Sequence, residues 1–95
     1  MSFSSESSPI DLLYRDPEAR SVLFYLTDAL AGTLLQIAGS THVKPERVRD
    51  VLQLLERADL AERIGGGTSP YSGVFSPSEK GLRVARDIRS GKGAS

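Results

Sequence analysis

The chain has 95 residues, of which 39% are hydrophobic and 25% charged, and its 12 basic side chains balance its 12 acidic ones. This length suits one small domain, and the lack of cysteine excludes a disulfide framework or a thiolate metal site. No stretch is long and apolar enough to span a bilayer, and the first residues lack the basic and apolar regions of a secretion signal, so we expect a cytoplasmic protein.

The first three expected helices have clear start signals. Pro9 and Pro17 suit a first helical position, because proline lacks the N–H group that would be unpaired there. Thr33 and Gln36, three residues apart, form a capping box. These signals predict helices over Pro9–Arg15, Pro17–Leu30 and Leu34–Ala38, the second ended by Gly32 and the third by Gly39.

The fourth expected helix begins at Pro45, and its apolar residues recur at helical spacing. Beyond it the pattern changes: residues 61–64 and 73–76 have the length of short strands, and residues 65–72 between them have strong turn composition. The sequence therefore predicts a β-hairpin with a long, mobile tip. The side chains of the fourth helix expected to face inward are Val48, Val51, Leu52 and Leu55, with Leu54 beside them.

The last helix is expected over Pro77–Ser90, with Ser76 and Glu79 as its capping box. Its buried side chains should be Leu82, Ala85 and Ile88. Residues 1–7 and 91–95 are expected to be disordered, which leaves one domain over residues 8–90. The predicted fold class is mostly α with a small β-hairpin (α+β), in the order helix-helix-helix-helix-hairpin-helix.

Several short motifs follow one another in an informative order. They are Asp16-Pro17, Ile37-Ala38, a turn over residues 39–42, Val43, the Leu52-x-x-Leu55-x-x-x-x-Leu60 spacing, and Ser76-Pro77-Ser78-Glu79-Lys80-Gly81. Together they resemble the winged helix-turn-helix of ArsR-like and MarR-like transcriptional regulators. The resemblance implies a DNA-binding regulator with the hairpin over residues 61–76 as its wing. Asp59 stands where these families usually have glycine, but aspartate tolerates the left-handed conformation, so we expect the turn to form.

In a helix-turn-helix the second helix of the motif lies in the major groove. The resemblance therefore implies that Arg47 and Arg49 pair with guanine edges and Gln53 with adenine. Asp50 would accept from a cytosine amine or orient an arginine. The candidate contacts to the DNA backbone are Ser40, Thr41, Lys44, the helix start capped by Thr33, Tyr71 at the hairpin tip and Lys80 in the last helix.

These assignments have competing interpretations. Turn chemistry alone accounts for Tyr71, and solubility accounts for Lys80. Residues 44–64 carry five acids and five bases, and Glu46 and Asp50 would repel phosphates. The alternative function is a winged helix that binds another protein, without direct DNA contact, through an apolar stripe of Val51, Leu54 and Ala58.

The sequence also bears on metal binding, enzyme activity and dimerisation. His42 is the only histidine, and a metal site needs several ligands, so we expect a surface turn residue and no cofactor. No glycine-rich phosphate loop with a lysine and no serine–histidine arrangement is present, so no enzyme is expected. Phe24 and Tyr25 directly follow Val22 and Leu23, which makes the second helix apolar around much of its circumference. We expect the first helix and a second subunit to cover it, giving a homodimer.

Overall fold

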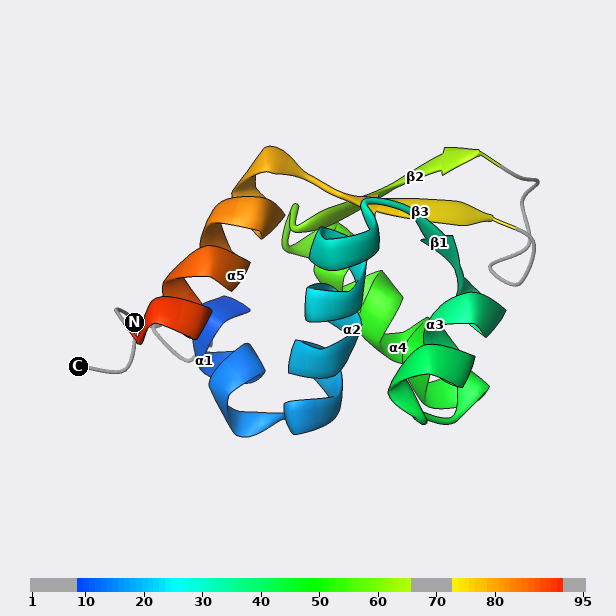
Figure 1. The fold of residues 1–95 in the computed structure, drawn as a ribbon, viewed down its shortest axis with the longest axis horizontal. Helices are drawn as coiled ribbons and strands as arrows, with labels where there is room; N and C mark the ends of the chain where they lie inside the picture. The colour runs from blue at the N-terminus through cyan, green and yellow to red at the C-terminus, as the bar shows by residue number, and fades with distance from the viewer. Residues whose placement is uncertain (1–8, 66–72, 92–95) are drawn as a thin grey trace, which may run out of the picture.

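The computed structural model describes residues 9–65 and 73–91, which form a mostly helical fold with a small sheet (Figure 1). The predicted architecture and element order are confirmed, except that the sheet has a further short strand. The expectations for residues 1–7, for residues 92–95 and for the hairpin tip lie outside the described residues. In chain order the elements are α1 (Pro9–Arg15), α2 (Pro17–Ala29), β1 (Gly32–Thr33), α3 (Leu34–Thr41), α4 (Pro45–Arg57), β2 (Ala61–Gly65), β3 (Val74–Pro77) and α5 (Glu79–Ser90).

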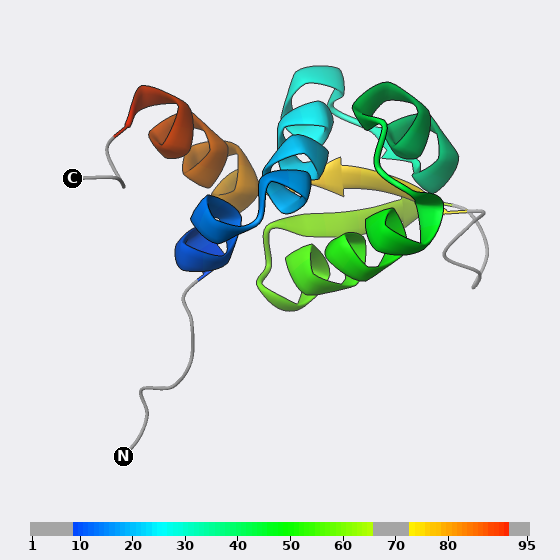
Figure 2. The same ribbon diagram turned by 90° about the horizontal axis from the view of Figure 1, so that it is seen from below.

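Helix α2 lies at the centre of the fold. It contacts α1, α3, α4, α5 and β3, and Figures 1 and 2 show α1 and α5 together at one end of the molecule with α3 at the other. Its Val22, Leu23 and Leu26 are fully buried, and Phe24 and Tyr25 are partly buried against the core. Neighbours within the chain therefore cover most of the apolar circumference that the sequence assigned in part to a second subunit.

The hydrophobic core joins all the described helices to the sheet. The inward face predicted for α4 is confirmed, and only Leu54 on that side keeps partial exposure. Phe75 of β3 supplies the largest fully buried side chain and connects the sheet to the helical part. The other fully buried large side chains are Leu13, Val22, Leu23, Leu26, Leu34, Ile37, Val48, Val51, Leu52, Leu55 and Leu60.

The sheet is antiparallel with the strand order β1-β3-β2. Gly32 and Thr33 of β1 pair with Phe75 and Val74 of β3. Strand β2 pairs with the other edge of β3, with an irregular register between Arg63 and Gly65. The sequence did not predict β1, because two residues carry no alternation of apolar and polar side chains.

Two helix ends differ from those predicted. Helix α2 ends at Ala29 with Leu30 in the left-handed conformation (φ +68°), so Gly32 is not its terminator. Gly32 instead lies in β1, where a Cβ atom would come 2.8 Å from the Tyr25 ring. Helix α3 continues through Gly39 to Thr41, because a helix interior accepts glycine at a modest cost in free energy.

The start of α5 also differs from the prediction. Strand β3 continues through Pro77, which pairs with Ala61, so Pro77 is not the first helical residue. The capping box of Ser76 and Glu79 is wrong. The cap is Ser78, whose Oγ accepts from the N–H of Gly81 at 2.9 Å.

The buried face of α5 is rotated by about one residue from the predicted one. Ala85 is buried as expected and Ile88 partly so, but Leu82 is 40% exposed. The inward positions are Gly81, Val84, Ala85 and Ile88, which have the i, i+3, i+4, i+7 spacing of one helix face. Because glycine has no side chain, hydrophobic periodicity could not assign Gly81 to the buried face.

Candidate nucleic-acid interface

Helices α3 and α4 form a helix-turn-helix (Figure 1). The predicted capping box starts α3: Thr33 Oγ1 accepts from the Gln36 N–H at 3.2 Å, and the Thr33 N–H donates to Gln36 Oε1 at 2.9 Å. His42 ends the helix at φ +61°, in the expected turn and exposed, and Val43 anchors the turn in the core. Lys44 follows as the N-cap of α4 with an exposed side chain that makes no capping hydrogen bond.

The outer face of α4 lies opposite its core residues. One residue advances a helix by about 100°, so Glu46, Asp50 and Gln53 fall on the side away from the core, and all three are exposed. Arg57, in the last turn, falls on the same side and is also exposed, so this face carries two carboxylates, one amide and one guanidinium. Arg47 and Arg49 lie on its two flanks, each with 37% of the side chain exposed.

Arg47 is ion-paired with the start of α2. Its Nη2 contacts Asp16 Oδ2, and its Nε donates to Glu18 Oε1 at 3.1 Å. Asp16 is itself held in place, because its Oδ1 accepts from the N–H groups of Glu18 at 3.0 Å and Ala19 at 3.3 Å as the N-cap of α2. This contact could not be predicted from the sequence, because 31 residues separate Asp16 from Arg47 and no spacing rule joins them.

The other cations of this region have fewer ion-pair partners than Arg47. Arg49 Nη2 lies 3.3 Å from Asp50 Oδ1, and the two side chains are 37% and 52% exposed, so water and ions screen this pair. Lys44 and Arg57 are exposed and form no ion pair with another described residue. An anion approaching α4 therefore meets Lys44 at the helix start and Arg49 on one flank.

The candidate phosphate contacts fall into two places. Ser40, Thr41 and Lys44 lie together around the turn between α3 and α4, with Ser40 exposed. The Thr41 hydroxyl donates to the Ile37 carbonyl at 2.7 Å, so its proton is committed and only its lone pairs are available. Thr33 lies at the opposite end of α3, about 12 Å along an eight-residue helix.

The remaining two predicted contacts do not join this group. Tyr71 lies outside the described residues. Lys80 is exposed in the first turn of α5, and Figure 1 shows α5 at the end of the molecule away from α3. The described part of the site is therefore α4 with the turn that precedes it.

A tight corner joins the end of α4 to the sheet and α5. Asp59 adopts the expected left-handed conformation, with φ +63°. The Ser78 hydroxyl donates to the Asp59 carbonyl at 2.6 Å, and the Ser78 N–H donates to the Leu60 carbonyl at 3.0 Å. A Cβ atom on Gly81 would overlap the Leu60 carbonyl oxygen. These contacts fix the sheet and α5 relative to the end of α4.

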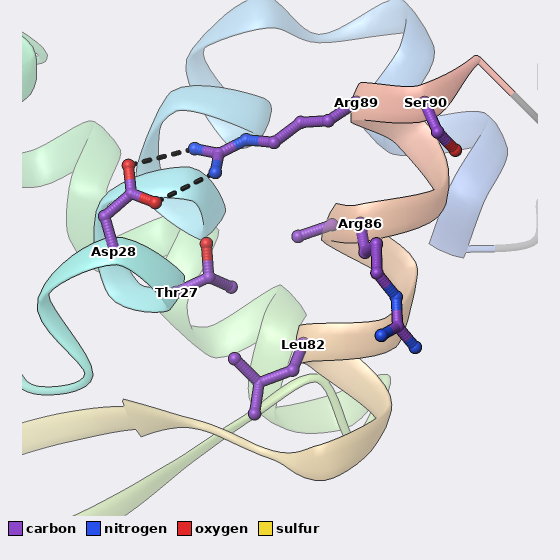
Figure 3. A pocket seen from close by; sticks show the side chains of 7 residues that line it. Thr27, Asp28, Leu82, Arg86, Arg89 and Ser90 are labelled. Carbon is purple, nitrogen blue, oxygen red and sulfur yellow. Dashed lines mark hydrogen bonds and ion pairs between the residues drawn. The ribbon is translucent and has the colours of Figure 1, made fainter.

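An open groove of about 390 Å³ separates the C-terminal ends of α2 and α5 (Figure 3). Arg89 crosses it from α5 to make two hydrogen bonds to Asp28, at 2.9 and 3.0 Å, and its guanidinium lies 4.3 Å from the centre of the Phe24 ring. The hydrogen bond from Arg89 lowers the pKa of Asp28, and Asp28 raises the pKa of Arg89. The residues lining the groove are Thr27, Asp28, Leu82, Ala85, Arg86, Arg89 and Ser90.

Two other kinds of feature are absent from residues 9–65 and 73–91. No helix there has the length and apolarity needed to cross a membrane. No cluster of three or more histidine, cysteine or acidic side chains there could hold a metal ion.

Two helices joined by a short turn, a third strand beside a β-hairpin, and a helix after the hairpin define a winged helix-turn-helix fold. Solved structures share it. A mutant of Lactococcus lactis ZitR is 19% identical with a TM-score of 0.69, over 83% of this chain and 53% of that one. NMB1585, a MarR family regulator from Neisseria meningitidis, is 19% identical with a TM-score of 0.69, over 81% of this chain and 54% of that one. The MepR–DNA complex of S. aureus is 20% identical with a TM-score of 0.68, over 82% of this chain and 67% of that one.

These similarities concern the fold. This chain spans about half the length of the first two structures. No protein-family model matches the sequence, and no curated protein matches it. The resemblance to MarR-like regulators inferred from short motifs is thus confirmed at the level of three-dimensional structure.

Proposed function

We propose that this protein is a DNA-binding transcriptional regulator that inserts α4 into the major groove of duplex DNA, with the β2–β3 hairpin as its wing. The observation that carries the proposal is the packing of α4. One face of the helix is buried in the core, while the opposite face is exposed beside the turn that bears Ser40 and Lys44. A recognition helix needs this arrangement. The fold shared with the MepR–DNA complex supports the same function.

Within this function, Arg49 and Gln53 read base edges from the exposed part of α4. Asp50, paired with Arg49, orients that arginine. Lys44 and Ser40 bind the backbone on one side of the groove, and the helix start at Thr33 binds a second phosphate. Thr41 joins them as a phosphate contact only by releasing its hydrogen bond to the Ile37 carbonyl. Tyr71 and Lys80 remain predicted backbone contacts outside this cluster.

A homodimer is part of the proposal, because paired recognition helices read two half-sites separated by about one turn of DNA. A cytoplasmic location belongs to it as well, since a regulator must reach the chromosome. Size-exclusion chromatography with light scattering tests the dimer directly. A strictly monomeric protein that also lacks salt-sensitive DNA binding would contradict the proposed DNA-binding homodimer.

The burial of Val51 counts against the alternative of a protein-binding stripe. Val51 is fully buried in the core, so Val51, Leu54 and Ala58 do not form an accessible surface. Leu54 and Ala58 are only partly exposed. The exposed side of α4 is polar, which suits the edges of bases better than an apolar partner.

The proposal is tested by titrating a labelled mixed-sequence duplex with the protein and following fluorescence anisotropy. Raising the salt from about 50 to 200 mM should weaken binding by orders of magnitude if several phosphates are contacted. Lys44→Ala should lower the slope of log affinity against log salt by about one. Arg89→Ala, at the far end of α5 where the side chain is paired with Asp28, is the control and should leave the slope unchanged. No binding at about 50 mM salt would refute the proposed function.

A further inference from the structure

The two arginines that flank the outer face of α4 are held in different ways. Arg49 meets one exposed carboxylate, Asp50, from its own helix. Arg47 meets two carboxylates from α2, and the side chain of Asp16 is only 17% exposed. Because the cap hydrogen bonds fix Asp16, it cannot swing away from Arg47 without uncapping α2.

This difference affects attraction to DNA. Lysine and arginine attract phosphates irrespective of sequence, and each cation that neutralises a phosphate strengthens binding to every duplex alike. An arginine already neutralised by two carboxylates contributes little to that attraction. Contacts to base edges, in contrast, favour only some sequences.

We propose that Asp16 and Glu18 determine the sequence selectivity of α4 by masking Arg47, which lowers the affinity for non-specific duplex DNA. The inference rests on the proposed function and deepens it. With Arg47 masked, the discrimination between base sequences depends on the side chains of α4 that are not paired with Asp16 or Glu18, chiefly Arg49 and Gln53.

The ion pairs of Arg47 with Asp16 and Glu18 are not needed to orient α4. The orientation of α4 is already set by four core side chains that are at most 2% exposed. Arg47 and Glu18 keep 37% and 51% of their side chains exposed, and pairs this exposed contribute little to folding stability. Their larger consequence is that a cation beside the recognition surface is withheld from DNA.

The test is the double variant Asp16→Asn with Glu18→Gln, titrated with a mixed-sequence duplex by fluorescence anisotropy. Asparagine caps helices as well as aspartate does, so the variant loses the two negative charges while keeping the cap of α2. Released Arg47 should add one phosphate contact. Affinity should then rise on the order of tenfold at about 50 mM salt, and the salt slope should steepen by about one. The affinity ratio between a duplex selected from a random pool by the unmodified protein and the mixed duplex should fall.

Two controls isolate Arg47. Adding Arg47→Ala to the double variant should abolish the gain in affinity and the steeper slope. Asp28→Asn with Asp87→Asn removes two carboxylates from the C-terminal parts of α2 and α5, and should change the slope little. Circular dichroism melting checks that each variant is folded.

The outcomes separate the two proposals. If the unmodified protein binds DNA with a salt slope but the Asp16, Glu18 variant gains no affinity, the masking proposal fails and the proposed function stands. A gain that survives Arg47→Ala, or that the control variant reproduces, likewise overturns the masking proposal. If neither the unmodified protein nor any variant binds, both fall.

Discussion

The corner between α4 and α5 and the outer face of α4 are fixed by different forces. In the corner, the backbone of Leu60 touches Gly81, and Ser78 makes hydrogen bonds to the backbone of Asp59, Leu60 and Gly81, so short-range packing leaves one arrangement. On the outer face of α4, Arg47 and Arg49 are held by ion pairs whose side chains remain partly exposed to water. Substitutions in the corner should therefore change stability, whereas substitutions on the outer face of α4 should change binding.

The largest effect is expected from Gly81→Ala. The added methyl group would overlap the Leu60 carbonyl oxygen, which belongs to the backbone and cannot rotate away. We expect a loss of up to about 3 kcal/mol in the free energy of unfolding, measured by urea denaturation. A variant as stable as the unmodified protein would show that the corner is not sterically fixed.

Gly39→Ala is the matched control for that substitution. Gly39 lies within α3, and a Cβ atom there meets nothing within 4 Å. Replacing a helical glycine with alanine should raise the free energy of unfolding by about 0.5 to 1 kcal/mol. Opposite signs at the two glycines in the same urea titration would sharpen the distinction between the corner and an open helix surface.

Ser78→Ala tests the hydrogen bonds of the corner without adding volume. The variant loses the cap on the Gly81 N–H and the bond to the Asp59 carbonyl. The expected loss is about 1 kcal/mol, and Ser78→Asp should recover part of it because aspartate also caps helices. Thermal melting of the three proteins makes this comparison.

On the outer face, a double-mutant cycle of Asp16→Asn and Arg47→Ala measures how far the ion pair stabilises the fold. The coupling should be about 0.2 to 1 kcal/mol, since the Arg47 side chain is 37% exposed. Urea titrations of the four proteins give the value. A coupling free energy as large as the loss caused by Gly81→Ala would mean that the ion pair of this face contributes as much to folding stability as the packing of the corner.

The smallest effect concerns pH at the other end of α2. Arg89 lowers the pKa of Asp28 below its ordinary value of 3.8 in the folded state. The stabilisation is therefore present above pH 3.8 and is lost as the pH falls through the folded-state pKa. Melting curves of the protein and of Asp28→Asn should differ at pH 6 and converge as the pH falls through the lowered pKa of Asp28. A difference that grows towards acid pH would have the wrong sign.

The helices could be predicted because their signals are local. Pro9, Pro17 and Pro45 mark true helix starts, and the Thr33 capping box is present as predicted. Pro77 misled the prediction, because proline also suits the end of a strand whose next residue is an N-cap. Strand β1 could not be predicted, since its existence depends on pairing with β3 more than forty residues later in the chain.

The candidate site was predictable only in part. Helical periodicity correctly separated the buried and exposed faces of α4. It could not indicate that Arg47 turns to α2, because a flexible side chain selects its partner only after the fold has brought Asp16 and Glu18 within reach. The electrostatics of the surface are therefore a tertiary property, whereas its residue composition is a local one.

The position of β3 in the sheet has a mechanical consequence. It pairs with β1, which leads directly into α3, and with β2, the other strand of the wing. Its last residue is separated from α5 by Ser78 alone. The wing is thus connected both to α5, through the single residue Ser78, and to α3, through the pairing of β3 with β1. A tilt of α5 would therefore move the wing and the helix-turn-helix together.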